Sequence, residues 1–103
     1  MEKPTIIVNN RMLEMPMPKA RLWREIVKFE DERQSVSVDE FCDGHINIIA
    51  RAFGVTTDEI FDNIDVDEIL PTYRRILTYI MQLLTSKLTG IKKNMEEDIT
   101  AQV

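Results

Sequence analysis

The sequence contains few of the residues from which catalytic and metal sites are built. Its 103 residues include one cysteine, Cys42, and one histidine, His45. An internal disulfide is therefore excluded, and no second Cys or His is present to complete a zinc site. A glycine-rich phosphate loop and a nucleophile elbow are also absent. We expect a protein that is not an enzyme and that needs no cofactor and no metal.

The sequence also lacks an excess of positive charge and a long apolar run. It carries 13 basic and 18 acidic residues, a net charge of −5, which disfavours nonspecific binding to nucleic acid or to anionic membranes. The N-terminal residues show no apolar signal region. The most apolar segment, Ile76–Leu88, is interrupted by polar residues and is shorter than the ~20 residues that a membrane span needs. We expect a soluble, intracellular protein with no nucleic acid or membrane partner.

The hydrophobic content of 44% is enough for a core, and the chain length suits one domain. Near the N-terminus, β-branched residues at Thr5–Val8 precede Asn9-Asn10, a pair that tolerates positive φ. The strand pattern resumes at Arg11–Met15, and Pro16 and Pro18 end it. This pattern predicts a short β-hairpin, with an extended arm as the alternative.

Helical periodicity dominates the rest of the chain. A first helix is predicted over residues 19–32, with Leu22, Trp23, Ile26 and Val27 in one apolar stripe. A second helix follows the capping-box pattern Ser37–Glu40 and ends at Gly54. Its apolar residues occupy much of its circumference, which predicts a central position. They are Phe41, His45, Ile48, Ile49 and Ala52, with Cys42, Ile46 and Phe53 beside them.

Two further helical segments are predicted after Gly54. A second capping box at Thr56–Glu59 opens a short helix, whose inward residues should be Ile60, Phe61 and Ile64. Asp65–Leu70 should form a turn or a short helical piece. Pro71 then suits the first turn of a last helix that ends at Gly90.

The predicted fold is mainly α, a compact bundle of about four to five helices with a short N-terminal β-hairpin or extended arm. Residues 1–94 should form a single helical domain. Within it, residues 1–17 form the hairpin or arm and residues 19–90 the helices. Residues 95–103 should form a flexible tail.

The stretch Ile49–Phe61 imitates a helix-turn-helix, because a helix, a glycine stop and a new helix cap follow one another. A small DNA-binding regulator is therefore the alternative function. Its recognition helix, however, would begin with Asp58, Glu59 and Asp62, where a DNA reader needs cations. The charge favours a structural corner.

Cys42 and His45 are three residues apart on one predicted helix, so an enzyme with a Cys–His nucleophile pair is a further alternative. That enzyme would have a reactive thiol. His45 lies on the apolar stripe of its helix, which favours a packed, hydrogen-bonded core histidine. The acids of Asp58–Glu68 do not fit the ligand spacing of an EF-hand calcium loop and are typical of helix N-termini.

Methionines and aromatic residues give the candidate partner-binding positions. Thioether side chains suit adaptable binding surfaces, although in the N-terminal arm they also suit gap-filling against the helices. The last helix has a broad apolar face that leaves room for self-association or for a client helix. The candidates are Met12, Met15, Met17, Trp23, Tyr73, Arg74, Leu84 and Leu88.

Three segments in order resemble a known family. They are PKARLWREIVKFEDER (Pro18–Arg33), INIIARAFGVTTDEIFDNIDVDEILPTYRRI (Ile46–Ile76) and LLTSKLTGIKKN (Leu83–Asn94). Together they resemble the tail assembly chaperones of long-tailed phages and prophages of Gram-positive bacteria, whose short form is similar to the lambda G component. The most specific parts are KAR-x-WRE at Lys19–Glu25 and LPTYR at Leu70–Arg74.

This resemblance implies a concrete function. Such chaperones are thought to bind the long, aggregation-prone tape measure protein and keep it soluble while the tail tube assembles. A longer form, made by programmed ribosomal frameshifting, recruits the tail tube protein. The resemblance thus implies a phage or prophage protein of virion morphogenesis in the cytoplasm of a bacterial host, without catalytic residues.

Overall fold

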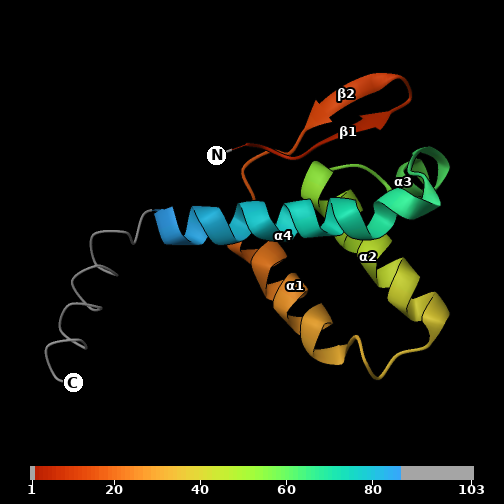
Figure 1. The fold of residues 1–103 in the computed structure, drawn as a ribbon, viewed down its shortest axis with the longest axis vertical. Helices are drawn as coiled ribbons and strands as arrows, with labels where there is room; N and C mark the ends of the chain where they lie inside the picture. Colours follow the sequence, from red (N-terminus) through yellow and green to blue (C-terminus); the bar gives the residue numbers. More distant parts are fainter. Residues whose placement is uncertain (1, 87–103) are drawn as a thin grey trace, which may run out of the picture.

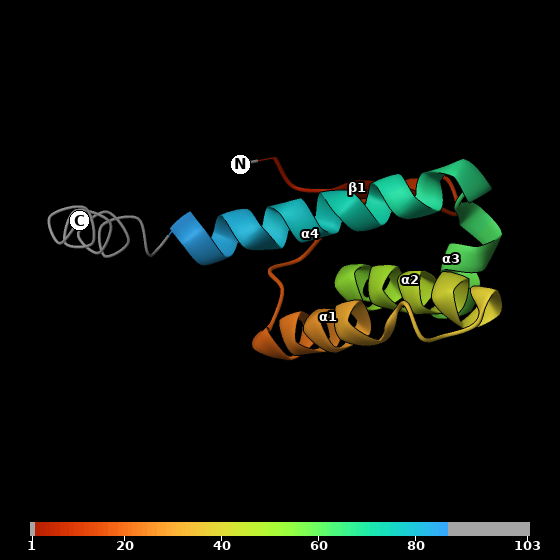
Figure 2. The ribbon, with the colours of Figure 1, turned by 60° about the horizontal axis from the view of Figure 1, so that its bottom comes forward.

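The computed structural model describes residues 2–86, which form a mainly helical structure with a short N-terminal hairpin (Figure 1). α4 and the hairpin lie in one layer, and α1 and α2 lie side by side in a second layer beneath α4 (Figure 2). The bounds of the elements, in chain order, are β1 Thr5–Val8, β2 Arg11–Glu14, α1 Ala20–Glu32, α2 Val38–Phe53, α3 Thr57–Asn63, the 3-10 turn η1 Val66–Glu68 and α4 Ile69–Ser86.

The N-terminal segment is a β-hairpin, not an extended arm. β1 and β2 pair antiparallel with Val8 opposite Arg11. Asn9 and Asn10 between them have φ values of 53° and 65°, as a two-residue type I′ turn requires. The turn is held to α3, because the Asn9 backbone N–H donates to Asn63 Oδ1 at 2.9 Å. The predicted turn chemistry is therefore confirmed, and the hairpin gains a contact that the sequence pattern did not predict.

The capping residues and the glycine stop predicted from the sequence are present at the ends of α2 and α3. Thr56 and Glu59 form a complete capping box, in which each side chain accepts from the backbone N–H of the other residue. At α2 only half of the box is present: Ser37 Oγ accepts from the Glu40 N–H, at 3.2 Å. Gly54 ends α2 with φ 72° in the left-handed region, where a Cβ is unfavourable.

α4 begins at Ile69, directly after η1, so Pro71 lies within its first turn, where its missing N–H leaves no helical bond unmade. This confirms the predicted short helical piece after Asp65. The predicted end of this helix at Gly90, the domain limit at residue 94 and the tail of residues 95–103 lie outside the described residues.

The core is formed where α2 packs against α1, α3 and α4. This is the central position that the apolar circumference of α2 predicts. Several of the largest buried side chains are fully enclosed. These are Met15, Ile26, Ile46, Ile49, Ile60 and Ile76.

Three side chains expected inside are exposed. Val27 lies at the margin of the α1 stripe, beyond the fully buried Ile26. Phe61 is 51% exposed because the short α3 buries one line of residues, and Ile60 occupies that line. Cys42, which lies beside the apolar stripe of α2, is exposed. In each case the periodicity identified the buried face correctly but overestimated its width.

Among residues 2–86, none of the helices is long and apolar enough to cross a membrane.

Candidate functional site

The methionine candidates of the hairpin region separate into surface and core. Met12 is 71% exposed and Met17 is also exposed, so both remain available to a partner. Met15 is 0% exposed, and we correct its assignment from partner contact to core. The cause is the hairpin itself: the Met15 N–H donates to the Pro4 carbonyl at 3.0 Å, which continues the β ladder and fixes the Met15 side chain inward.

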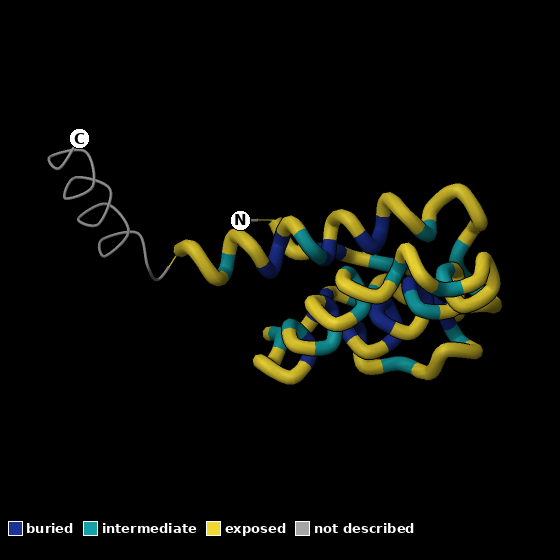
Figure 3. Tube along the Cα trace, turned by 90° about the horizontal axis from the view of Figure 1, so that it is seen from below, coloured by how far each residue is buried: buried dark blue, intermediate teal, exposed yellow. Residues whose placement is uncertain are grey.

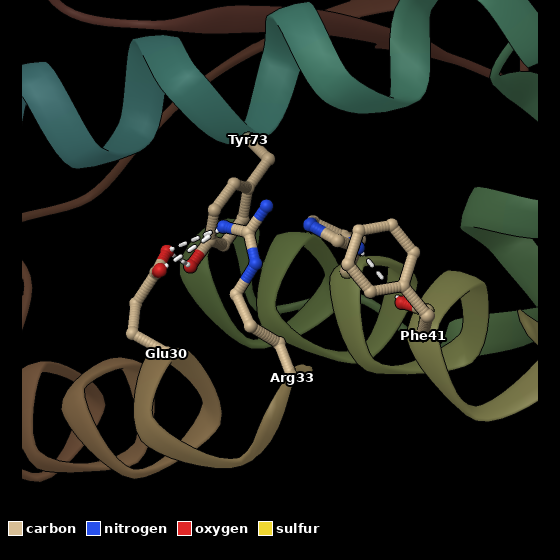
Figure 4. A network of polar contacts seen from close by, with 5 residues as sticks. Glu30, Arg33, Phe41 and Tyr73 are labelled. Atoms are coloured by element: carbon tan, nitrogen blue, oxygen red, sulfur yellow. Dashed lines mark hydrogen bonds and ion pairs between the residues drawn. The ribbon is translucent and has the colours of Figure 1, made fainter. Parts of the chain in front are cut away.

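Tyr73 is also a core residue and not a partner contact. Its ring is buried, and its hydroxyl donates to Glu30 Oε1 at 2.5 Å. Arg33 Nη1 donates to the same carboxylate at 3.0 and 3.2 Å. Figure 4 shows Tyr73 descending from α4 toward Glu30 and Arg33 at the end of α1. This network joins the end of α1 to the start of α4 across 43 residues of sequence.

Burial and hydrogen bonding in this network shift the pKa values of Glu30 and Tyr73. Burial by itself raises the pKa of Glu30, but the hydrogen bonds from Tyr73 and Arg33 outweigh it, so the pKa is lowered overall. For Tyr73, burial and then the hydrogen bond to the Glu30 carboxylate raise the pKa above its usual range. The pair is therefore an ionised carboxylate with a neutral phenol that donates to it.

His45 occupies the centre of an aromatic enclosure. It is fully buried, and the rings of Phe29, Phe41 and Tyr73 contact it edge-on at centroid distances of 4.8, 4.5 and 4.5 Å. His45 Nδ1 lies 2.7 Å from the Phe41 carbonyl oxygen. Since a carbonyl only accepts, Nδ1 carries the proton. The expected packed, hydrogen-bonded core histidine is confirmed.

The other ring nitrogen of His45 is unusual. Nε2 is buried and has no hydrogen-bond partner, although buried polar atoms are normally paired. Burial lowers the pKa of His45, and the bond to the Phe41 carbonyl only partly opposes this. The imidazole is thus held neutral, with its unprotonated Nε2 buried and unpaired.

Gly44 allows this enclosure to close. A Cβ built on Gly44 would lie 2.2 Å from Cε1 of Phe29, closer than atoms approach without a shift. The bare backbone of α2 therefore admits the Phe29 ring, which in turn touches His45. The sequence signal for this packing is a glycine inside a helical pattern, which is unfavourable for helix formation unless packing requires it.

The geometry separates Cys42 from His45 although they are three residues apart on α2. Cys42 is exposed, and His45 is enclosed with Nδ1 bonded to the backbone. No hydrogen bond joins the two side chains among the described residues. An accessible thiol is therefore expected here whether or not Cys42 has a function. Within residues 2–86, no group of three His, Cys, Asp or Glu side chains is placed to hold a metal ion.

The α2–α3 corner, which imitates a helix-turn-helix, presents an acidic and apolar surface. Asp58, Phe61 and Asp62 are exposed on α3, and Glu59 is occupied by the cap of Thr56. This stretch of α3 carries no lysine or arginine.

The most extended apolar surface lies along α4. Leu70, Met81 and Leu84 are exposed, the last two by 46% and 40%, and Leu77 between them is partly buried. At helical spacing these four residues line one side of α4, which we call the α4 ridge. Figure 3 shows the last turns of α4 extending past the other helices, with most of their trace exposed. Leu84 is thus a surface residue as predicted.

The remaining candidates differ in their accessibility. Arg74 is exposed on α4, next to the ridge. Trp23 is partly buried and packs against the core, so it contributes mainly to α1 packing. Leu88 lies outside the described residues. Sequence reasoning missed Leu70 and Met81, although the seven-residue spacing of Leu70, Leu77 and Leu84 was a visible signal for a helix-binding seam.

No known protein family, curated protein or solved structure matches the chain. Its function is therefore argued from its own residues.

Proposed function

We propose that this protein is a phage tail assembly chaperone that binds the tape measure protein and keeps it soluble during tail tube assembly. The α4 ridge is the observation that carries the proposal, together with the ordered segments that resemble such chaperones. A holding chaperone needs an accessible apolar surface and no reaction centre. The ridge provides that surface, and within residues 2–86 its Met81 and Leu84 lie on the last turns of α4, which extend past the other helices (Figure 3).

The ridge has the form that suits a helical client. Its apolar side chains recur at spacings of three, four and seven residues, which is how a helix presents a stripe to another helix. Its length from Leu70 to Leu84 is about 20 Å, given a rise of ~1.5 Å per residue. A single client helix of a few turns therefore covers it. The partial burial of Leu77 anchors the stripe to the core, so the surface is presented by a fixed helix.

Co-expression tests the proposal. The tape measure protein encoded beside this gene would be expressed alone and together with the chain. We expect the client to be largely insoluble alone and to co-purify with the chain when both are present. Unchanged client solubility with no complex would overturn the proposed function.

A pair of variants localises the contact. Leu84→Glu places a carboxylate on the ridge, whereas Ser86→Glu places the same charge on the opposite side of α4, two residues away. Both positions are exposed, so both variants should fold. We expect Leu84→Glu to lose most of the co-purifying client and Ser86→Glu to keep it.

We also propose that a longer, frameshifted form recruits the tail tube protein, as in the family that the chain resembles. A slippery site near the end of the gene and a second, longer product detected by mass spectrometry are the expected observations. A gene that yields only one product would contradict this part of the proposal without affecting the client-binding test.

The DNA-binding alternative has its own test, a mobility-shift assay at low salt with the operator region of the gene cluster. The acidic surface of α3 repels phosphates, so we expect no shift. A shift abolished by ~200 mM salt would indicate a phosphate-binding surface elsewhere on the chain.

A further inference from the structure

The backbone edge of β1 is unpaired on one side, and this side faces a groove. In antiparallel pairs, residues alternate between those bonded to the partner strand and those pointing away from it. The bond from the Met15 N–H to the Pro4 carbonyl marks Pro4 as a residue directed toward the partner strand. Val8, beside the two-residue turn, is another. Thr5 and Ile7 therefore direct their N–H and C=O groups to the outer edge of the hairpin.

That outer edge has no protein partner among residues 2–86. No hydrogen bond from the helices or loops reaches the backbone of Thr5 or Ile7. An open strand edge is a template for another strand, and proteins usually cover or charge such edges. Here the edge carries neither a charged side chain nor a proline at Thr5–Val8, and Ile7 is 62% exposed.

Two cavities adjoin this edge. One, of about 530 Å³, lies between β1 and the segment from α3 to the start of α4, and its lining includes Ile7, Ile64 and Arg75. The other, of about 540 Å³, lies between residues 2–5 and the middle of α4, and its lining includes Lys3, Arg74 and Tyr79. Thr5 and Arg75 line both cavities. The two cavities therefore adjoin one another, and we call the pair of cavities the edge groove.

The shape of the edge groove suits an extended chain. β1 runs alongside α4 in both Figure 1 and Figure 2, so one wall is a strand edge and the other is a helix. A strand rises ~3.3 Å per residue, so residues 2–8 extend over about 20 Å, of which Thr5–Val8 is regular strand. A bound segment of about six residues would pair with this strand and continue along the residues before it. Added strands of this kind gain affinity from backbone bonds and specificity from alternate side chains.

The charged residues that line the edge groove favour an extended segment with an acidic side chain. At the N-terminal end of the groove, Lys3, Arg74 and Arg75 face a single acid, Glu2. Arg75 is paired with Glu68 at 3.5 Å, whereas the ion pairs of the described residues do not include Lys3 or Arg74. In a protein of net charge −5, this is a local site for a carboxylate. Toward the hairpin turn, the lining includes the apolar side chains of Ile7, Met12 and Ile64. It also includes two acids, Asp65 and Glu68, of which Glu68 is paired with Arg75.

We infer that the edge groove binds an extended segment of a partner protein, which adds as a strand to β1. The segment carries an acidic side chain that faces Lys3 and Arg74, and apolar side chains that cover Ile7 and Ile64. Arg74 lies between the edge groove and the α4 ridge, but none of the ridge residues lines the groove. The inference therefore stands apart from the proposed client binding.

The test uses two synthetic hexapeptides, one alternating valine with glutamate and the other alternating valine with lysine. Each is titrated to millimolar concentration into the full chain labelled with ¹⁵N. We expect the acidic peptide to shift the amide signals of Thr5 and Ile7 and to bind at least tenfold more tightly than the basic peptide. No shift with the acidic peptide, equal binding of both peptides, or shifts confined to Met81 and Leu84 would overturn the inference.

Matched proline variants test the strand edge. Ile7→Pro removes an N–H from the outer edge of β1. Glu14→Pro removes an N–H from the outer edge of β2, because Glu14 is paired opposite Thr5, and Glu14 does not line the groove. We expect Ile7→Pro to weaken the acidic peptide at least tenfold and Glu14→Pro to leave its affinity within twofold. Equal losses in both variants would exclude strand addition to β1.

Arg74→Glu covers the case in which Ile7→Pro unfolds the hairpin. Arg74 is exposed and has no ion pair among residues 2–86, so its replacement should leave the fold intact. We expect the acidic peptide to lose at least tenfold in affinity and the basic peptide to gain. An unchanged preference between the peptides would show that Arg74 does not face the bound segment.

Discussion

Two faces of α4 are both apolar but have opposite surroundings. On one face, Tyr73, Ile76 and Ile80 are buried against the rest of the protein, and Tyr73 is bonded to Glu30. On the other face, the α4 ridge, Leu70, Met81 and Leu84 remain exposed. One helix therefore serves two purposes. Its buried face holds the fold together, and its ridge presents the surface that we propose for client binding.

The largest difference between these two faces should appear in stability. Ile76→Ala removes a fully buried side chain and leaves a cavity, so we expect a loss of about 3 kcal/mol in the free energy of unfolding. Leu84→Ala should lose less than about 1 kcal/mol, because its side chain already contacts water. Urea unfolding of both variants measures the contrast. Similar losses would mean that the ridge is packed as tightly as the buried face of α4.

The enclosure around His45 gives the next largest effect. Alanine is a better helix former than glycine by about 1 kcal/mol, yet the new methyl group of Gly44→Ala would meet the Phe29 ring. We expect a net loss of about 1–2 kcal/mol from this overpacking. In a Phe29→Leu background the same substitution should become neutral or stabilising. A Gly44→Ala variant more stable than the unaltered chain would show that the Phe29 ring does not pack against the backbone at Gly44.

Stability should also depend on pH through His45. Its pKa is lowered from 6.5 in the folded chain, so the unfolded chain binds the proton first and stability falls as pH drops below about 6.5. The slope should reach at most about 1.4 kcal/mol per pH unit. Arg33 and Glu30 of α1 and Tyr73 of α4 are the titratable groups that face it.

Denaturant unfolding between pH 5 and pH 8 measures this slope, and His45→Asn provides the control. Since the chain has one histidine, the slope in this range should disappear in the variant even if the variant is less stable throughout. Glu30, whose pKa is also lowered, contributes stability above its usual value of 4.5 that is lost as pH falls through its folded pKa. A slope between pH 6 and pH 7 that persists in His45→Asn would assign it to another group.

The smallest effect concerns the hairpin. Asn10 has a φ of 65°, which glycine adopts without strain and which the type I′ turn favours. We expect Asn10→Gly to stabilise the chain by about 0.5 kcal/mol or to be neutral. Thermal unfolding of the variant checks this prediction, and a clear loss of stability would indicate that the Asn10 side chain makes a contact of its own.

Local sequence signals predicted where the hairpin turn lies and where helices begin and end. The Asn9-Asn10 turn, the Thr56 cap and the Gly54 stop depend on a few neighbouring residues each, so the sequence contains all the information that they need. Position along a helix also located the buried line through Ile26 and Ile60. Periodicity does not show how wide a face the neighbouring helices cover. For this reason the prediction that Phe61 and Val27 lie inside was wrong.

Contacts between distant segments could not be predicted in the same way. The bond between Glu30 and Tyr73 joins residues 43 apart, and nothing near either residue specifies the other. Met15 was assigned to a binding surface because its burial depends on the hairpin folding back over the helices. The edge groove likewise exists only once β1 lies along α4, and the sequence shows only its two separate walls.

The central claim, that the α4 ridge binds the tape measure protein, is tested most directly by comparing two charge variants in one co-purification. The quantity to measure is the amount of client recovered with Leu84→Glu relative to Ser86→Glu, after both chains are shown to have the same helix content. The account predicts that the recovery with Leu84→Glu is a small fraction of that with Ser86→Glu. Equal recovery of the client with both variants would contradict it.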